Sequence, residues 1–226
     1  ESKQFPPDAT IEQVRQIEPV LILANHKQRE KRKQKKYMDI WMYYRCHVSS
    51  SDMLASSSFA GKQMYYLVKD KTSKSYLGIF SLTDNDKSIS AINTFMGPEY
   101  DSRTNKQYVM DLSTCVPVQP FGHAFCGGKL ITRLAFSKQV REDFQQRYGF
   151  PPCAIVTMGI HGRAPQYEHL RELTCIGETK GQSVAHIGME VFRICKEYAQ
   201  ENNLVIRKKM HLVQRVFRDL EIDMQY

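Results

Sequence analysis

The sequence predicts an α/β domain of the α+β type, built on a mixed sheet that is flanked by N- and C-terminal helices. Two observations indicate this class. Apolar runs at 64–68 and 76–82 lie on either side of a polar turn, which is typical of a β-hairpin. A third apolar run at 108–116 is followed by a glycine-containing loop, a helical pattern and another apolar run at 153–158. This order favours two parallel strands joined by a helix.

The other elements follow from local patterns. An amphipathic helix is expected at 8–18, with Asp8 or Thr10 as its N-cap, and the serine-rich segment 49–61 predicts a surface loop or linker. The strand at 108–116 ends at Pro117, and one helix is expected up to Tyr148 because apolar residues recur every four positions before Gly149. We also expect a short element at the apolar patch 89–96, a buried strand at 153–158, and helices at 167–173, 186–202 and 207–220.

These elements suggest three parts: a basic helical N-terminal region with the serine-rich linker at 1–62, an α/β core at 63–183, and basic C-terminal helices at 184–226. A length of 226 residues suits one main domain with small appendages. The chain shows neither an apolar run of the roughly 20 residues that a membrane span needs nor a secretory signal. Its six cysteines are far apart, as in reduced intracellular proteins, so we expect a cytoplasmic or nuclear location.

Charge is concentrated near the N-terminus. The net charge is +8, and residues 26–36 contain seven cations and a single acid, followed by an aromatic run at 37–44. Such a run suits a nucleic-acid backbone, and Trp41, Tyr43 and Tyr44 could stack on bases. The alternatives are a solvated basic helix that leads into a buried aromatic anchor, and a localisation signal. The cations proposed to contact nucleic acid are Lys27, Arg29, Lys31, Arg32, Lys33, Lys35 and Lys36, together with Arg207, Lys208, Lys209 and Arg215 near the C-terminus.

The loop at 115–130 is the second candidate site. Glycines let backbone N–H groups approach an anion, and a helix N-terminus adds a positive partial charge, so this loop suits a phosphate. It matches neither a Walker A loop nor a dinucleotide fingerprint. The alternative is that Gly127 and Gly128 only allow a helix to pack closely on the sheet. The histidines show no paired-ligand spacing, so we expect no metal site.

The order of strands and loop resembles the GNAT-type N-acetyltransferases, whose loop is written Q/R-x-x-G-x-G/A, as in Gln119–Ala124. This resemblance implies an acetyltransferase-like topology, acetyl-CoA as the candidate cofactor, and Tyr167 as a catalytic general acid. The favoured alternative for Tyr167 is that it packs beneath its own helix. The residues that it implies for the cofactor are Gln119, Gly122, Ala124, Gly127, Gly128 and Lys129.

A second resemblance covers residues 64–190. The segments Tyr76–Ile79, Asp111–Gly122, Gly127–Ile131 and Gly162–Tyr167 resemble, in that order, the family of unknown function typified by the Druantia anti-phage protein DruA. It implies an acetyltransferase-like fold found in defence systems, viruses and mobile elements, with a suspected nucleic-acid role. Three hypotheses remain: a nucleic-acid-associated module, an acyl-CoA-dependent N-acyltransferase, and a subunit whose basic surfaces hold protein partners.

Overall fold

The structure is a computed structural model. It describes residues 8–26, 30–48, 61–84, 89–101, 104–119, 121–159, 164–177, 189–204, 212, 215, 216 and 219–221. These residues fall into two compact units, one formed by the described residues up to 177 and the other by those from 189 onward. Each unit is described by itself.

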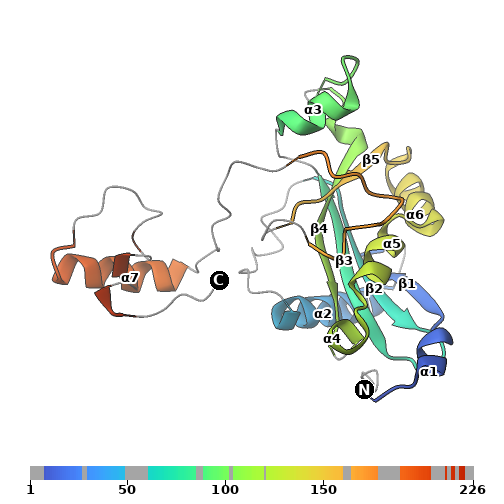
Figure 1. The fold of residues 1–226 in the computed structure, drawn as a ribbon, viewed down its shortest axis with the longest axis horizontal. Coiled ribbons are helices and arrows are strands. Elements are labelled where there is room, and N and C mark those ends of the chain that lie inside the picture. Colours follow the sequence, from blue (N-terminus) through green and yellow to red (C-terminus); the bar gives the residue numbers. More distant parts are fainter. Residues whose placement is uncertain are drawn as a thin grey trace. The chain divides into compact units, whose positions relative to one another are not determined.

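The first unit is built on a five-stranded mixed sheet (Figure 1). Its strands are β1 (Pro19–Leu23), β2 (Gln63–Asp70), β3 (Tyr76–Asp84), β4 (Val109–Pro117) and β5 (Ala154–Val156), in the spatial order β1-β2-β3-β4-β5. The first four strands are antiparallel to their neighbours, and β5 is parallel to β4. The predicted mixed sheet, its hairpin and its parallel pair are confirmed.

Strand β1 lies in the region for which the sequence predicted helices. Its residues are branched and apolar apart from Pro19, and it pairs with β2 from Pro19 opposite Asp70 to Leu23 opposite Tyr66. The amide of Glu18 donates to the Asp70 carboxylate at 2.9 Å, which fixes the start of this pairing. The N-terminal region therefore adds a strand to the sheet as well as helices.

One face of the sheet is covered by α2 (Lys31–Val48), as Figure 1 shows. Trp41 and Tyr44 of this helix are buried against Tyr65, Leu67 and Ile79. The Trp41 indole N–H donates to the carbonyl oxygen of Phe80 at 3.3 Å. The alternative of a basic helix that leads into a buried aromatic anchor is confirmed, so Trp41 and Tyr44 are not exposed for stacking on bases.

The other face is covered by α1 (Ile11–Arg15), α4 (Phe121–Phe125), α5 (Gly128–Ala135) and α6 (Lys138–Tyr148). The single helix predicted up to Tyr148 is wrong. The chain breaks after Ala135, and the Ser137 side chain accepts a hydrogen bond from the Val140 amide as the N-cap of α6. Gly149 ends α6 at φ +87°, as predicted, and Thr10 caps α1.

The remaining predictions have mixed outcomes. Helix α3 (Ser90–Met96) occupies the patch at 89–96, but β5 is half-buried rather than buried. Residues 165–169 form turns, so the helix at 167–173 is wrong. In the second unit, α7 (Met189–Glu201) confirms the described part of the helix at 186–202 and packs its Cys195 and Ala199 on Leu212 and Val216. Most of the segments 49–61 and 207–220 lies outside the described residues.

Candidate nucleic-acid interface

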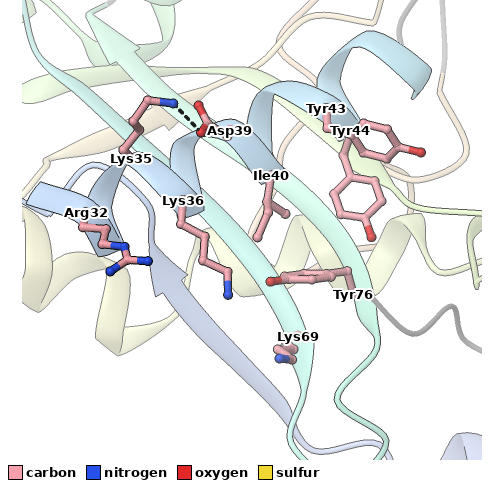
Figure 2. A pocket seen from close by; sticks show the side chains of 9 residues that line it. All are labelled: Arg32, Lys35, Lys36, Asp39, Ile40, Tyr43, Tyr44, Lys69 and Tyr76. Carbon is pink, nitrogen blue, oxygen red and sulfur yellow. Dashed lines mark hydrogen bonds and ion pairs between the residues drawn. The ribbon is translucent and has the colours of Figure 1, made fainter. Parts of the chain in front are cut away.

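A groove of about 600 Å³ opens between α2 and the strands β2 and β3 (Figure 2). Helix α2 supplies one wall, and the ends of β2 and β3 that flank the hairpin turn supply the other. The residues that line it are Arg32, Lys35, Lys36, Asp39, Ile40, Tyr43, Tyr44, Lys69 and Tyr76.

The amphipathic pattern of α2 explains which residues reach the groove. Trp41 and Tyr44 fix the buried face of the helix on the sheet. Residues three and four positions apart lie on one helix face, so Arg32, Lys36, Ile40 and Tyr43 form a row beside that buried face. The groove is therefore a direct consequence of how Trp41 anchors α2.

Positive charge dominates the lining. Four of the lining side chains are cations, and the single carboxylate among them belongs to Asp39. That carboxylate lies 2.8 Å from the Lys35 ammonium, with both side chains largely exposed. Within the described part of the chain, neither Arg32 nor Lys36 forms an ion pair with another residue. This arrangement can hold an anion that carries more than one charge.

Aromatic rings line the other end of the groove. Tyr43 is 56% exposed, and its ring lies 5.4 Å from that of Tyr44 and 4.2 Å from that of His47, between centroids. Tyr44 in turn lies 5.4 Å from Tyr76, and the Lys69 ammonium lies 5.3 Å from the Tyr76 ring centroid. Burial, with Tyr37 and Tyr44 nearby, raises the pKa of Tyr76 to about 12, so its hydroxyl remains a hydrogen-bond donor at neutral pH.

The glycine-containing loop expected at 115–130 is largely wrong: within its described residues β4 continues to Pro117, and helix α4 and the start of α5 follow, so Gly122 lies in a helix. The glycines of this segment are packed by the chain's own side chains. The Gly122 amide donates to the Val118 carbonyl at 3.0 Å. A Cβ at Gly127 would overlap the Phe121 ring, and one at Gly128 would lie 2.8 Å from the Gln166 side-chain oxygen. Close packing is thus a sufficient reason for Gly127 and Gly128. Gln119, Ala124 and Lys129 are exposed, and the predicted contact of this loop with a cofactor stays a prediction.

Tyr167 packs against the core from a turn, not from beneath a helix. Burial raises its pKa, the neighbouring Cys115 raises it further, and a hydrogen bond with Thr157 opposes this. Side chains near Tyr167 also donate hydrogen bonds to the main chain of β4. The Thr157 hydroxyl donates to the Leu112 carbonyl at 3.3 Å, and the Gln166 side-chain amide donates to the Cys115 carbonyl at 3.2 Å. The role of Tyr167 as a general acid stays a prediction.

Comparison with known proteins identifies the family. Residues 9–218 match the model of the family described as "DruA: Druantia protein DruA". The chain belongs to the DruA family. The Druantia protein DruA of Escherichia coli (strain UMEA 4076-1) is 26% identical over an alignment of 163 residues, which covers 64% of this chain and 40% of that protein. This DruA-family chain therefore corresponds to less than half of its curated relative.

The family predicted from the sequence segments is thus confirmed, over more of the chain than those segments spanned. No solved structure matches this DruA-family chain, so the acetyltransferase-like topology stays a prediction. Every residue that lines the groove lies within the part matched by the DruA family.

The cations predicted to contact nucleic acid in this DruA-family chain fall into three groups: those that line the groove, those that are exposed elsewhere, and those outside the described residues. Arg32, Lys35 and Lys36 line the groove. Lys31 and Lys33 are exposed outside its lining, and the Lys33 ammonium lies 3.4 Å from the Glu30 carboxylate. Arg215 is exposed in the second unit. Outside the described residues lie Lys27, Arg29, Arg207, Lys208 and Lys209.

Sequence reasoning missed Lys69 and Tyr76 as lining residues. Both lie at the ends of the predicted hairpin strands, next to the polar turn. Nothing in the local sequence there indicates that a helix packs against these strand ends. Among the described residues of this DruA-family chain, no group of three His, Cys, Asp or Glu side chains is placed to hold a metal ion. Within the same residues, none of the helices combines the length and apolar character needed to cross a membrane.

Proposed function

We propose that this DruA-family chain binds nucleic acid, and that the groove between α2, β2 and β3 holds the phosphate backbone. The observation that carries the proposal is the charge of the groove lining, with four cations and one carboxylate. Asp39 is already paired with Lys35, which leaves Arg32, Lys36 and Lys69 facing the groove. On this proposal, the chain supplies the nucleic-acid contacts of a Druantia-type defence protein.

The proposal rests on ordinary electrostatics. Like charges four residues apart on a helix repel each other, as Arg32 and Lys36 do, and a polyanion in the groove would convert this repulsion into attraction. Each phosphate that a cation neutralises also releases condensed counterions, which drives binding at low salt. Because the cations come from two separate walls of the groove, they can contact a nucleic-acid strand from both sides.

The test is a fluorescence anisotropy titration of the full chain with labelled oligonucleotides over a range of salt concentrations. With three phosphates neutralised, the logarithm of the association constant should fall with the logarithm of salt at a slope of about −2 on a single strand and about −3 on a duplex. Absence of binding at low salt, for DNA and RNA alike, would overturn the proposal.

A matched pair of variants separates the groove from net charge. The double variant Arg32→Gln, Lys36→Gln should make the slope shallower by about 1.4 on a single strand. The control, Lys138→Gln with Arg141→Gln, removes two exposed cations from α6, which covers the other face of the sheet. Equal effects of the two variants would show that the groove has no special role.

We propose acyl-CoA binding as the second candidate function. Its support is the strand order: four antiparallel strands, a glycine-containing segment with helices α4 and α5 after β4, and a strand parallel to β4, which is the strand order that the resemblance to N-acetyltransferases implies. If this is correct, coenzyme A should raise the melting temperature of the full chain saturably. Replacing the exposed Lys129 by Glu should weaken that effect, whereas no shift at millimolar coenzyme A would exclude the candidate.

A further inference from the structure

Helix α2 contributes both cations and tyrosines to the lining of the groove, and the cations precede the tyrosines along the helix. Arg32, Lys35 and Lys36 lie in its first two turns, and Tyr43 lies about two turns later. At a rise of 1.5 Å per residue, Lys36 and Tyr43 are roughly 10 Å apart along the helix axis. Figure 2 shows Arg32, Lys35 and Lys36 toward one end of the groove, Tyr43 and Tyr44 toward the other, and Lys69 beside Tyr76.

Tyr43 is held in place and yet accessible. Its ring is in edge contact with Tyr44, which is buried, and lies at an interplanar angle of 34° to His47. A ring nitrogen of His47 lies 2.7 Å from the Tyr43 carbonyl oxygen, which fixes the imidazole beside the tyrosine. Despite these neighbours, Tyr43 is 56% exposed. An aromatic ring that is pre-oriented and exposed in the same groove as several cations can act as a stacking platform for a base.

We infer that the groove binds single-stranded nucleic acid and that an unpaired base stacks on Tyr43. This inference rests on the proposed function and names its substrate. Arg32 and Lys36 hold phosphates farther along the same strand, toward the start of α2. Lys69, on the opposite wall, closes the groove over the same stretch of backbone.

The exposed aromatic ring in the groove favours a single strand over a duplex. The groove, with a volume of about 600 Å³, is large enough for a short stretch of strand. In a duplex the faces of the bases are stacked on one another, whereas splayed bases of a single strand offer their faces to aromatic side chains. A stacking platform at Tyr43 can therefore bind a base of a single strand but not a base of a duplex.

The experiment uses the full chain and three labelled probes: a single strand, the same sequence as a duplex, and a single strand of equal length with abasic sites. Tyr43→Ala should lower the affinity for the first probe about 5- to 150-fold, which is the range found for base–aromatic stacking. Tyr43→Phe keeps the ring and should stay within about twofold of the original chain. The affinities for the duplex and the abasic strand should not respond to Tyr43→Ala.

A matched control is Phe95→Ala, which removes an aromatic ring that is 60% exposed on α3 and is absent from the groove lining. It should leave the affinities for all three probes unchanged. If Tyr43→Ala is silent, or weakens abasic and normal strands equally, the stacking inference is overturned while the charged groove survives. If no probe binds, the proposed function itself has failed.

Discussion

Replacing Trp41 tests how much of the anchoring of α2 on the sheet comes from this buried side chain. Trp41 is 4% exposed, its ring centroid lies 4.7 Å from that of Tyr65, and its indole N–H donates to Phe80. Trp41→Ala removes the ring contacts and the hydrogen bond together, whereas Trp41→Phe keeps much of the ring volume and removes the hydrogen bond. The two variants therefore separate packing from hydrogen bonding.

The expected losses differ in size. Truncating a buried tryptophan to alanine costs about 3–5 kcal/mol of unfolding free energy, because transfer and cavity terms add. Losing the hydrogen bond alone costs about 1 kcal/mol, and leaving the Phe80 carbonyl without this donor brings the total for Trp41→Phe to about 1–2 kcal/mol. Since a domain is stable by only about 5–15 kcal/mol, the alanine variant loses a large share of its stability.

The assay is urea unfolding followed by far-UV circular dichroism, because Trp41 is the only tryptophan and its replacement removes the fluorescence signal. The burial of Trp41 can also be checked in the unchanged chain, because the emission of a buried tryptophan should be blue-shifted and poorly quenched by iodide while the chain is folded. A loss below about 1 kcal/mol for Trp41→Ala, or equal losses for both variants, would refute the packing argument.

Three further changes should alter stability in measurable ways. Gly127→Ala forces a Cβ into the buried Phe121 ring and should lower the unfolding free energy by about 1–3 kcal/mol in a urea titration; a neutral result would mean that the loop relaxes freely. Ser137→Ala removes the N-cap of α6 and should cost about 1 kcal/mol in the same assay, whereas Ser137→Asn, another good cap, should restore most of it. Burial favours the protonated form of Asp70, but hydrogen bonds from Ser73 and the Glu18 amide outweigh it and lower its pKa, so its contribution is present above the ordinary aspartate pKa and lost as pH falls through the lowered value. Asp70→Asn should therefore destabilise the chain at pH 6 and have little effect near pH 2, and a constant difference across that range would contradict the sign of the shift.

Much of the sheet was predictable because its signals are local. The β2–β3 hairpin has a continuous apolar run on each side of a polar turn, and β4 ends where Pro117 interrupts the pattern. Strand β1 was missed because five apolar residues after a short helix have no turn partner in sequence, and the pairing with β2 spans more than forty residues. The break before α6 was missed because apolar residues continue on both sides, although the step from Ala135 to Val140 is five residues rather than four.

Only one wall of the groove could be predicted from the amino-acid sequence. The density of cations before an aromatic run indicates a basic helix with a buried end, and the structure has both. Which cations line a common surface depends on how Trp41 orients the helix, and the contribution of Lys69 depends on where the hairpin turn lies beneath α2. Such juxtapositions arise from tertiary packing, which no local pattern encodes.

Strands β4 and β5 differ in length, and this difference affects whether the edge of the sheet can pair with a strand of another chain. β4 runs from Val109 to Pro117, but β5 covers only the first three of its residues. Along the rest of that edge, Thr157 and Gln166 occupy two main-chain carbonyls with their side chains. At the opposite edge, β1 is only five residues long and starts with a proline, which has no N–H to donate. In the described part of the chain, strand addition between copies therefore meets short or occupied edges, so the sheet resists edge-to-edge aggregation.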